Sequence, residues 1–94
     1  MILTRDVLID KIEEGIVKVE PFNVKNVGPA SIDLTLDNKT RVFVGYKDIV
    51  LSENCDYKKI SKIVDINKGY LLKPGELVLG ITKEKIILPG NICG

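Results

Sequence analysis

The chain contains no histidine and no tryptophan, and each absence narrows the functions that it can carry. Without histidine, the commonest general base and metal-ligating side chain is unavailable. Arginine, the preferred side chain for bidentate binding of phosphate, occurs only as Arg5 and Arg41. The 14 basic and 13 acidic residues are interspersed and leave a net charge of +1. The sequence therefore contains no basic patch, and binding to nucleic acid or to a membrane surface is not predicted.

Cysteines are also few, and their positions exclude the usual metal site. Cys55 and Cys93 lie far apart in no metal-ligand spacing, so no zinc site is predicted. We expect both to be reduced, small hydrophobic residues. The apolar start Met-Ile-Leu is followed at once by the polar residues 4–6, so no signal peptide is expected. No apolar run is long enough for a membrane span, and we expect a cytoplasmic protein.

What the sequence has in quantity is aliphatic side chains. Apolar residues make up 45% of the 94 positions and aromatic residues only 5%, so we expect a core built from Ile, Leu and Val. This length allows one domain over residues 1–94, and a chain this short buries only about 60 to 65% of its unfolded surface. Stability is therefore expected to be marginal unless the chain associates with something else.

Hydrophobic periodicity predicts one short helix followed by short strands. Thr4 is a suitable N-cap, and Gly15 is suited to end the helix. Pattern and turn residues predict strands over 16–19, 31–36, 39–44, 48–51, 60–66, 70–72, 77–82 and 86–88, with 77–82 buried on both faces. Turns are expected at 37–38, 45–46, 73–76, 83–85 and 89–91. This order predicts a mainly β sandwich or barrel with strands missing.

The stretch over residues 28–36 shows the clearest alternation. After a Gly-Pro turn signal, three aliphatic residues point one way, while Ser31, Asp33 and Thr35 point the other, about 6 to 7 Å apart along the strand. This row is either an ordinary polar face or part of a functional site.

The sequence offers few carboxylates for acid-base chemistry. Asp33 is the only carboxylate inside this polar row beside hydroxyls, whereas Glu76 and Glu84 lie in turns and are expected to be solvated. A lone general base would need burial or a nearby like charge, and the sequence shows neither.

Three stretches together carry a resemblance. They are MILTRD with the downstream EPF, VGPASIDLTLDN over residues 27–38, and LKPGELVLGITKEKIILP over residues 72–89. In this order and spacing they resemble the amino-terminal half of dCTP deaminases, within the trimeric dUTPase-like superfamily. Asp37 is a departure, because the family usually has Gly there.

The resemblance implies a distorted β-barrel or jelly roll, assembled as a homotrimer with active sites between subunits. It implies hydrolytic deamination of the deoxycytidine nucleotide dCTP to dUTP, continued in some relatives to dUMP. It also implies that no zinc is used and that Mg²⁺ arrives with the triphosphate, so no cofactor is bound by this chain itself.

The resemblance assigns few site residues to this chain. Ser31 and Asp33 match motif positions, with residues 28–30 shaping the turn, and in the superfamily this Asp supports the site rather than acting as base. The family's Arg-Ser-Ser-type phosphate-binding motif, its catalytic Glu and its closing carboxy-terminal residues correspond to positions after Gly94. No catalytic, substrate-binding or metal-ligating residue is therefore assigned.

Three functional hypotheses remain open from the sequence. The first is the amino-terminal portion of a dCTP deaminase-like hydrolase that is inactive as this 94-residue chain. The second is a non-catalytic β-barrel module of the same descent that serves assembly or binding. The third, a complete dUTPase-type enzyme, would need a tyrosine-bearing motif with its own Asp and a glycine-rich tail, which the sequence lacks.

Overall fold

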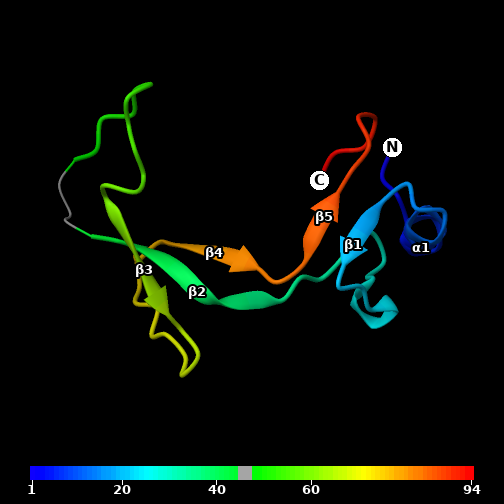
Figure 1. Ribbon diagram of the computed structural model, residues 1–94, viewed down its shortest axis with the longest axis horizontal. Helices are drawn as coiled ribbons and strands as arrows, with labels where there is room; N and C mark the ends of the chain where they lie inside the picture. The colour runs from blue at the N-terminus through cyan, green and yellow to red at the C-terminus, as the bar shows by residue number, and fades with distance from the viewer. Residues whose placement is uncertain (45–47) are drawn as a thin grey trace. The chain divides into compact units, whose positions relative to one another are not determined.

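The structure, a computed structural model, describes residues 1–44 and 48–94, and it is mainly β with one short helix, as predicted. The predicted break at Gly45 and Tyr46 lies outside the described residues. The elements are α1 (Arg5–Glu13), β1 (Lys18–Glu20), the 3-10 helix η1 (Val24–Asn26), β2 (Leu36–Phe43), β3 (Ser61–Asp65), β4 (Val78–Thr82) and β5 (Lys85–Ile87) (Figure 1).

The strands form two separate sheets, in the orders β1-β5 and β3-β2-β4. Within the part of the chain that the structure describes, neither sheet closes into a barrel. The chain divides into two compact units. We call residues 1–35 with 82–94 the terminal unit, and residues 36–81 the central unit.

Helix α1 begins and ends where its sequence signals predict. Thr4 is the N-cap, although its hydroxyl makes no capping hydrogen bond, and the Leu8 N–H donates to the Thr4 carbonyl at 2.8 Å. Gly15 follows the last turn with a φ of +75°, a left-handed conformation that glycine adopts without a steric penalty. Leu8 is the buried residue of α1.

The terminal unit is closed by pairing between β1 and β5. The two strands are antiparallel, with Val19 opposite Ile86 (Figure 1). Val17 and Val19 are 1% and 6% exposed, and with Leu8 and Val27 they form an aliphatic core. This confirms the expectation of a core without aromatic residues. Both ends of the chain belong to this unit.

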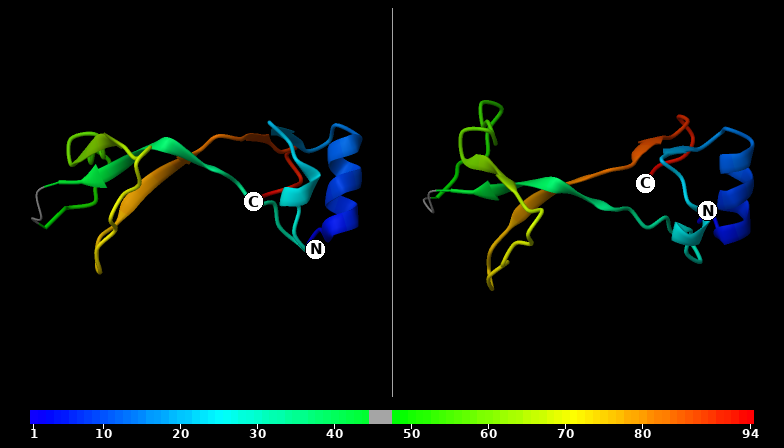
Figure 2. Two further views of the ribbon diagram at one scale, coloured as in Figure 1. Left: turned by 90° about the horizontal axis from the view of Figure 1, so that it is seen from below. Right: turned by 60° about the horizontal axis from the view of Figure 1, so that its bottom comes forward.

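The central unit is built around β2. Strand β3 pairs with it in antiparallel register, with Arg41 opposite Ile63, and β4 is the neighbour on the other side. Val42 is buried, as are two polar residues, Thr40 and Ser61. The connection over residues 66–77 joins β3 to β4 (Figure 2), and its Ile66 N–H donates to the Asn38 carbonyl of β2 at 2.7 Å.

The strand predicted over residues 31–36 and the turn predicted at 37–38 are both wrong. Ile32 forms only an isolated bridge with Val27, and residues 33–35 belong to no strand. The ladder begins at Leu36 and runs straight through Asp37 and Asn38 to Phe43. The side chains of Leu34 and Leu36 are 40% and 57% exposed, so they do not enter a core.

Two further strand predictions fail and one burial prediction is wrong. Residues 48–51 and 70–72 are irregular. Strand β4 forms within the predicted range 77–82, but the side chains of Leu79 and Ile81 are 43% and 60% exposed rather than buried. By contrast, β1, β3 and β5 overlap their predicted ranges, and the turns at 73–76 and 89–91 form, with Gly75 at a φ of +79°.

Replacing a core valine tests which contacts hold the terminal unit. Val17→Ala is expected to lower the free energy of unfolding by about 2 kcal/mol, because it removes two buried methyl groups and leaves a cavity. Val24, which is 46% exposed, provides the matched control, and Val24→Ala should change stability by less than about 0.5 kcal/mol. Urea denaturation followed by circular dichroism measures both, and equal effects would contradict the assigned core.

Candidate functional site

The motif around Ser31 folds into a small hairpin in the terminal unit. The Gly28 N–H donates to the Ser31 carbonyl at 2.8 Å, and the Asp33 N–H donates to the Asn26 carbonyl at 2.7 Å. Between these bonds lies the bridge of Val27 with Ile32, and Val27 is only 2% exposed. The backbone therefore holds both arms of the hairpin in fixed register.

The tip of this hairpin also holds the start of the helix. The Arg5 N–H, which has no partner within α1, donates to the Pro29 carbonyl at 2.8 Å. A Cβ built at Gly28 would lie 2.6 Å from the Ser31 hydroxyl oxygen, so a larger residue there requires this hydroxyl to move.

The side chains of Ser31 and Asp33 lie on one arm of this hairpin and are exposed. Within the described residues, neither the Ser31 hydroxyl nor the Asp33 carboxylate makes a side-chain hydrogen bond. Both groups therefore face solvent. Their supporting role in a nucleotide site stays a prediction.

The carboxylate of Glu84, which the sequence analysis placed in a solvated turn, makes a long-range contact that the sequence did not predict. Its Oε2 accepts the Thr35 N–H at 2.8 Å, and the Lys83 N–H donates to the Thr35 carbonyl at 2.9 Å. We call Thr35, Lys83 and Glu84 the Thr35 clamp. Hydrogen bonding by Thr35, first through its side chain and then through its backbone, lowers the pKa of Glu84 from its ordinary value. The Glu84 carboxylate is thus solvent-accessible, as expected, and it also holds the Thr35 N–H in place.

Glu76 likewise has partners, in the central unit. It accepts a hydrogen bond from the Tyr70 hydroxyl, and its other oxygen accepts the Lys73 N–H at 3.0 Å. The Tyr70 hydrogen bond, followed by the Lys73 backbone, lowers the pKa of Glu76. The carboxylate closes the predicted turn over residues 73–76, so its role is structural.

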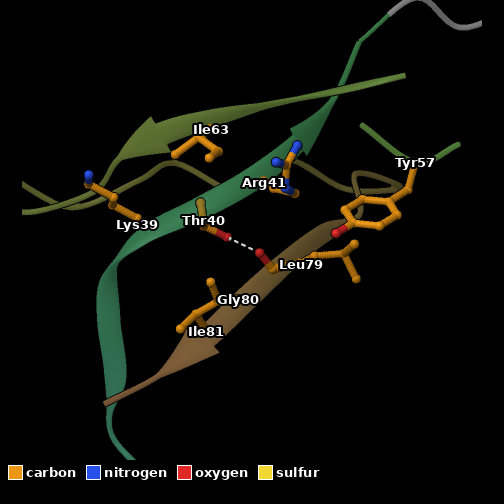
Figure 3. Close-up of a pocket in the computed structure, with 8 residues that line it drawn as sticks. All are labelled: Lys39, Thr40, Arg41, Tyr57, Ile63, Leu79, Gly80 and Ile81. Carbon is orange, nitrogen blue, oxygen red and sulfur yellow. Dashed lines mark hydrogen bonds between the residues drawn. The ribbon is translucent and has the colours of Figure 1, made fainter. Parts of the chain in front are cut away.

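The central unit carries a hollow of about 360 Å³ on one face of its sheet (Figure 3). Arg41 lies over the ring of Tyr57, 5.1 Å from its centre, and one guanidinium nitrogen donates to the Ser61 hydroxyl at 3.2 Å. The Thr40 hydroxyl donates to the Leu79 carbonyl at 2.8 Å, which ties β2 to β4. The lining residues are Lys39, Thr40, Arg41, Tyr57, Ile63, Leu79, Gly80 and Ile81.

No site for a metal ion is visible in the described part of the chain. Residues 1–44 and 48–94 contain no group of three or more His, Cys, Asp or Glu side chains that could hold one. Cys55 and Cys93 are free and exposed rather than part of a core. Among the same residues, no helix has the length and apolar character needed to cross a membrane.

The family model and the individual relatives that match this chain all belong to the same group of proteins. A family model described as dCTP deaminase-like matches residues 2–94. The chain is 37% identical over 98 residues to the dCTP deaminase of Marinomonas sp. (strain MWYL1), and the match covers 93% of this chain and 50% of that protein. It is 35% identical over 85 residues to the "dCTP deaminase, dUMP-forming" of Corynebacterium diphtheriae, covering 88% of this chain and 46% of that protein. The chain therefore spans about half the length of the curated relatives that it matches.

The contact between Gly28 and Ser31 can be tested by paired substitutions. Gly28→Ala should lower the free energy of unfolding by about 1 kcal/mol, because the added methyl group forces the Ser31 hydroxyl to move. Adding Ser31→Ala should restore at least about 0.5 kcal/mol, measured as a double-mutant cycle. Gly90→Ala is the control, since a Cβ there meets no atom within 4 Å. Strict additivity of the pair would contradict the contact.

The Thr35 clamp predicts a specific pH dependence. Because the pKa of Glu84 is lowered in the folded chain, its stabilising contribution is complete above the ordinary value of 4.5 and is lost as the pH falls through the folded pKa. The amide proton of Thr35 should therefore shift with a midpoint below 4.5 in an NMR titration. Glu84→Gln should abolish this transition, and a Thr35 amide that titrates equally in that variant would contradict the assignment.

Proposed function

This chain belongs to the dCTP deaminase-like family, and on that premise we propose that it forms the amino-terminal part of a nucleotide hydrolase acting on dCTP. In the proposed reaction, water adds to the cytosine ring, its oxygen replaces the amino group, and ammonia leaves to give dUTP. The observation that carries the proposal is the family match over residues 2–94, together with relatives named dCTP deaminase.

The second step of the proposed reaction concerns the triphosphate. Several relatives, among them the Corynebacterium diphtheriae protein, are named dUMP-forming, whereas the Marinomonas protein is named dCTP deaminase alone. We propose deamination as the common activity and cleavage to dUMP as a property that depends on residues outside this chain. We propose that Mg²⁺ arrives with the nucleotide.

Within the proposed enzyme, this chain supplies a backbone framework that positions supporting side chains, and it supplies no catalytic group. The hairpin backbone presents the side chains of Ser31 and Asp33, and the Thr35 clamp fixes the segment that follows them. We propose these two residues as supporting residues, and assembly as a cytoplasmic homotrimer as the setting in which they act.

The proposal predicts that the 94-residue chain alone does not convert dCTP. The same chain joined after Gly94 to the part of the Marinomonas dCTP deaminase outside the matched half should release ammonia, measured by a coupled assay and by chromatography of dUTP. Turnover by the short chain would contradict the expected inactivity. Absence of turnover in the joined protein, together with a cooperative melt, would contradict the enzymatic assignment.

The alternative is a non-catalytic module for assembly or binding. Exposed aliphatic side chains and the open strand edges of both sheets favour it, because such edges pair with other chains. Intact mass in the native cells separates the two proposals. A species near 10.4 kDa that forms a defined oligomer would favour the module, whereas a species of about twice that mass would favour the enzyme.

A further inference from the structure

The polar row of Ser31, Asp33 and Thr35 divides in the structure into free and bonded members. Within residues 1–44 and 48–94, the side chains of Ser31 and Asp33 make no hydrogen bond that would fix their direction. Thr35 differs, because its N–H and its carbonyl both have partners in the Thr35 clamp. The placement of Ser31 and Asp33 therefore depends on their backbone, and Thr35 is part of what holds that backbone.

The backbone at Asp33 is held without a strand ladder, since residues 33–35 belong to no strand. On one side of Leu34, the Asp33 N–H donates to the Asn26 carbonyl at 2.7 Å. On the other side, the Thr35 N–H donates to Glu84 Oε2 at 2.8 Å. These two bonds restrict the segment from both directions, and the second comes from a residue 49 positions away.

The bond from Thr35 to Glu84 has a local effect rather than a large effect on stability. The Glu84 carboxylate is solvent-accessible, and a hydrogen bond in contact with water is exchanged for one to solvent at small net cost. The terminal unit is held by its own aliphatic core and by the pairing of β1 with β5. The main consequence of the bond is therefore that it restricts the backbone next to Asp33.

We infer that Glu84 is a positioning residue for the Asp33 side chain, and that it acts through the Thr35 N–H without touching the nucleotide. This inference rests on the proposed function, in which Asp33 supports the nucleotide site. With the bond made, the Asp33 carboxylate keeps one placement. Without it, residues 33–35 sample several placements, and a bound nucleotide meets a correctly placed carboxylate for only part of the time.

The first test measures backbone order in the 94-residue chain by ¹⁵N NMR relaxation. The order parameters of the Asp33 and Thr35 amides should be about 0.85, the value of a rigid backbone. Glu84→Ala should lower both to below about 0.6, whereas Glu84→Gln should retain them, because an amide oxygen also accepts the Thr35 N–H. Unchanged order in the Glu84→Ala variant would overturn the inference.

Glu13→Ala is the matched control for this measurement. Glu13 is an exposed carboxylate of the same unit, and within the described residues its side chain makes no hydrogen bond. The order of the Asp33 and Thr35 amides should be unchanged in this variant. An equal loss of order in Glu13→Ala and Glu84→Ala would assign the effect to the loss of any charge and would overturn the inference.

The second test measures deamination of dCTP by the joined protein, in which Gly94 is followed by the unmatched part of the Marinomonas dCTP deaminase. Asp33→Asn and Glu84→Ala should each lower kcat/KM about tenfold, and Glu84→Gln should stay within about threefold of the unsubstituted protein. Because both changes act on one carboxylate, adding Glu84→Ala to Asp33→Asn should lower kcat/KM no further. Losses that multiply in the double variant, as a general structural defect would produce, would overturn the inference.

The two tests keep this inference apart from the proposed function. Absence of deamination in every joined protein, the unsubstituted one included, would contradict the proposed function, and the order of the Asp33 amide would still decide whether Glu84 positions it. Full activity of the Glu84→Ala variant would support the function and overturn the inference. A loss of its activity with the order of Asp33 unchanged would overturn the inference as well.

Discussion

The Thr35 clamp is the constraint on which the rest of the structure depends. Residues 36–81 leave the terminal unit at Thr35 and return to it at Thr82, next to Lys83 and Glu84. Closing a loop of this length costs on the order of 3 kcal/mol in chain entropy. The β1–β5 pairing and its buried valines offset that cost, and the clamp fixes where β2 can begin and where β4 must end.

Local signals in the sequence were sufficient for much of the fold. Thr4 and Gly15 marked the ends of α1, Pro74 and Gly75 marked a turn, and alternation marked β3. Alternation failed over residues 31–36, because the Gly28 turn pairs only Val27 with Ile32 and the Thr35 N–H is taken by a carboxylate instead of a strand. In the candidate site, Ser31 and Asp33 could be named from their motif. Glu84 could be named as a carboxylate, but its contact with Thr35 could not be predicted, because the two residues lie 49 positions apart.

The burial error in β4 has a different physical origin. An apolar run such as residues 77–82 predicts a strand that is buried on both faces. That prediction assumes that other elements cover both faces of the sheet. In the described chain β4 has β2 as its neighbour, and Leu79 and Ile81 remain exposed. The sequence of β4 therefore matches a more complete assembly of strands than the one that these residues form by themselves.

The pairing of β1 with β5 also constrains when the terminal unit can fold during synthesis. Strand β1 ends at Glu20, and its partner is complete only at Ile87. At roughly 5 to 20 residues per second, a ribosome needs roughly 3 to 13 seconds to add the residues between them. Throughout this interval Val17 and Val19 lack the strand that covers them, while all of the central unit is made first. The earliest strand of the nascent chain is thus among the last to be paired.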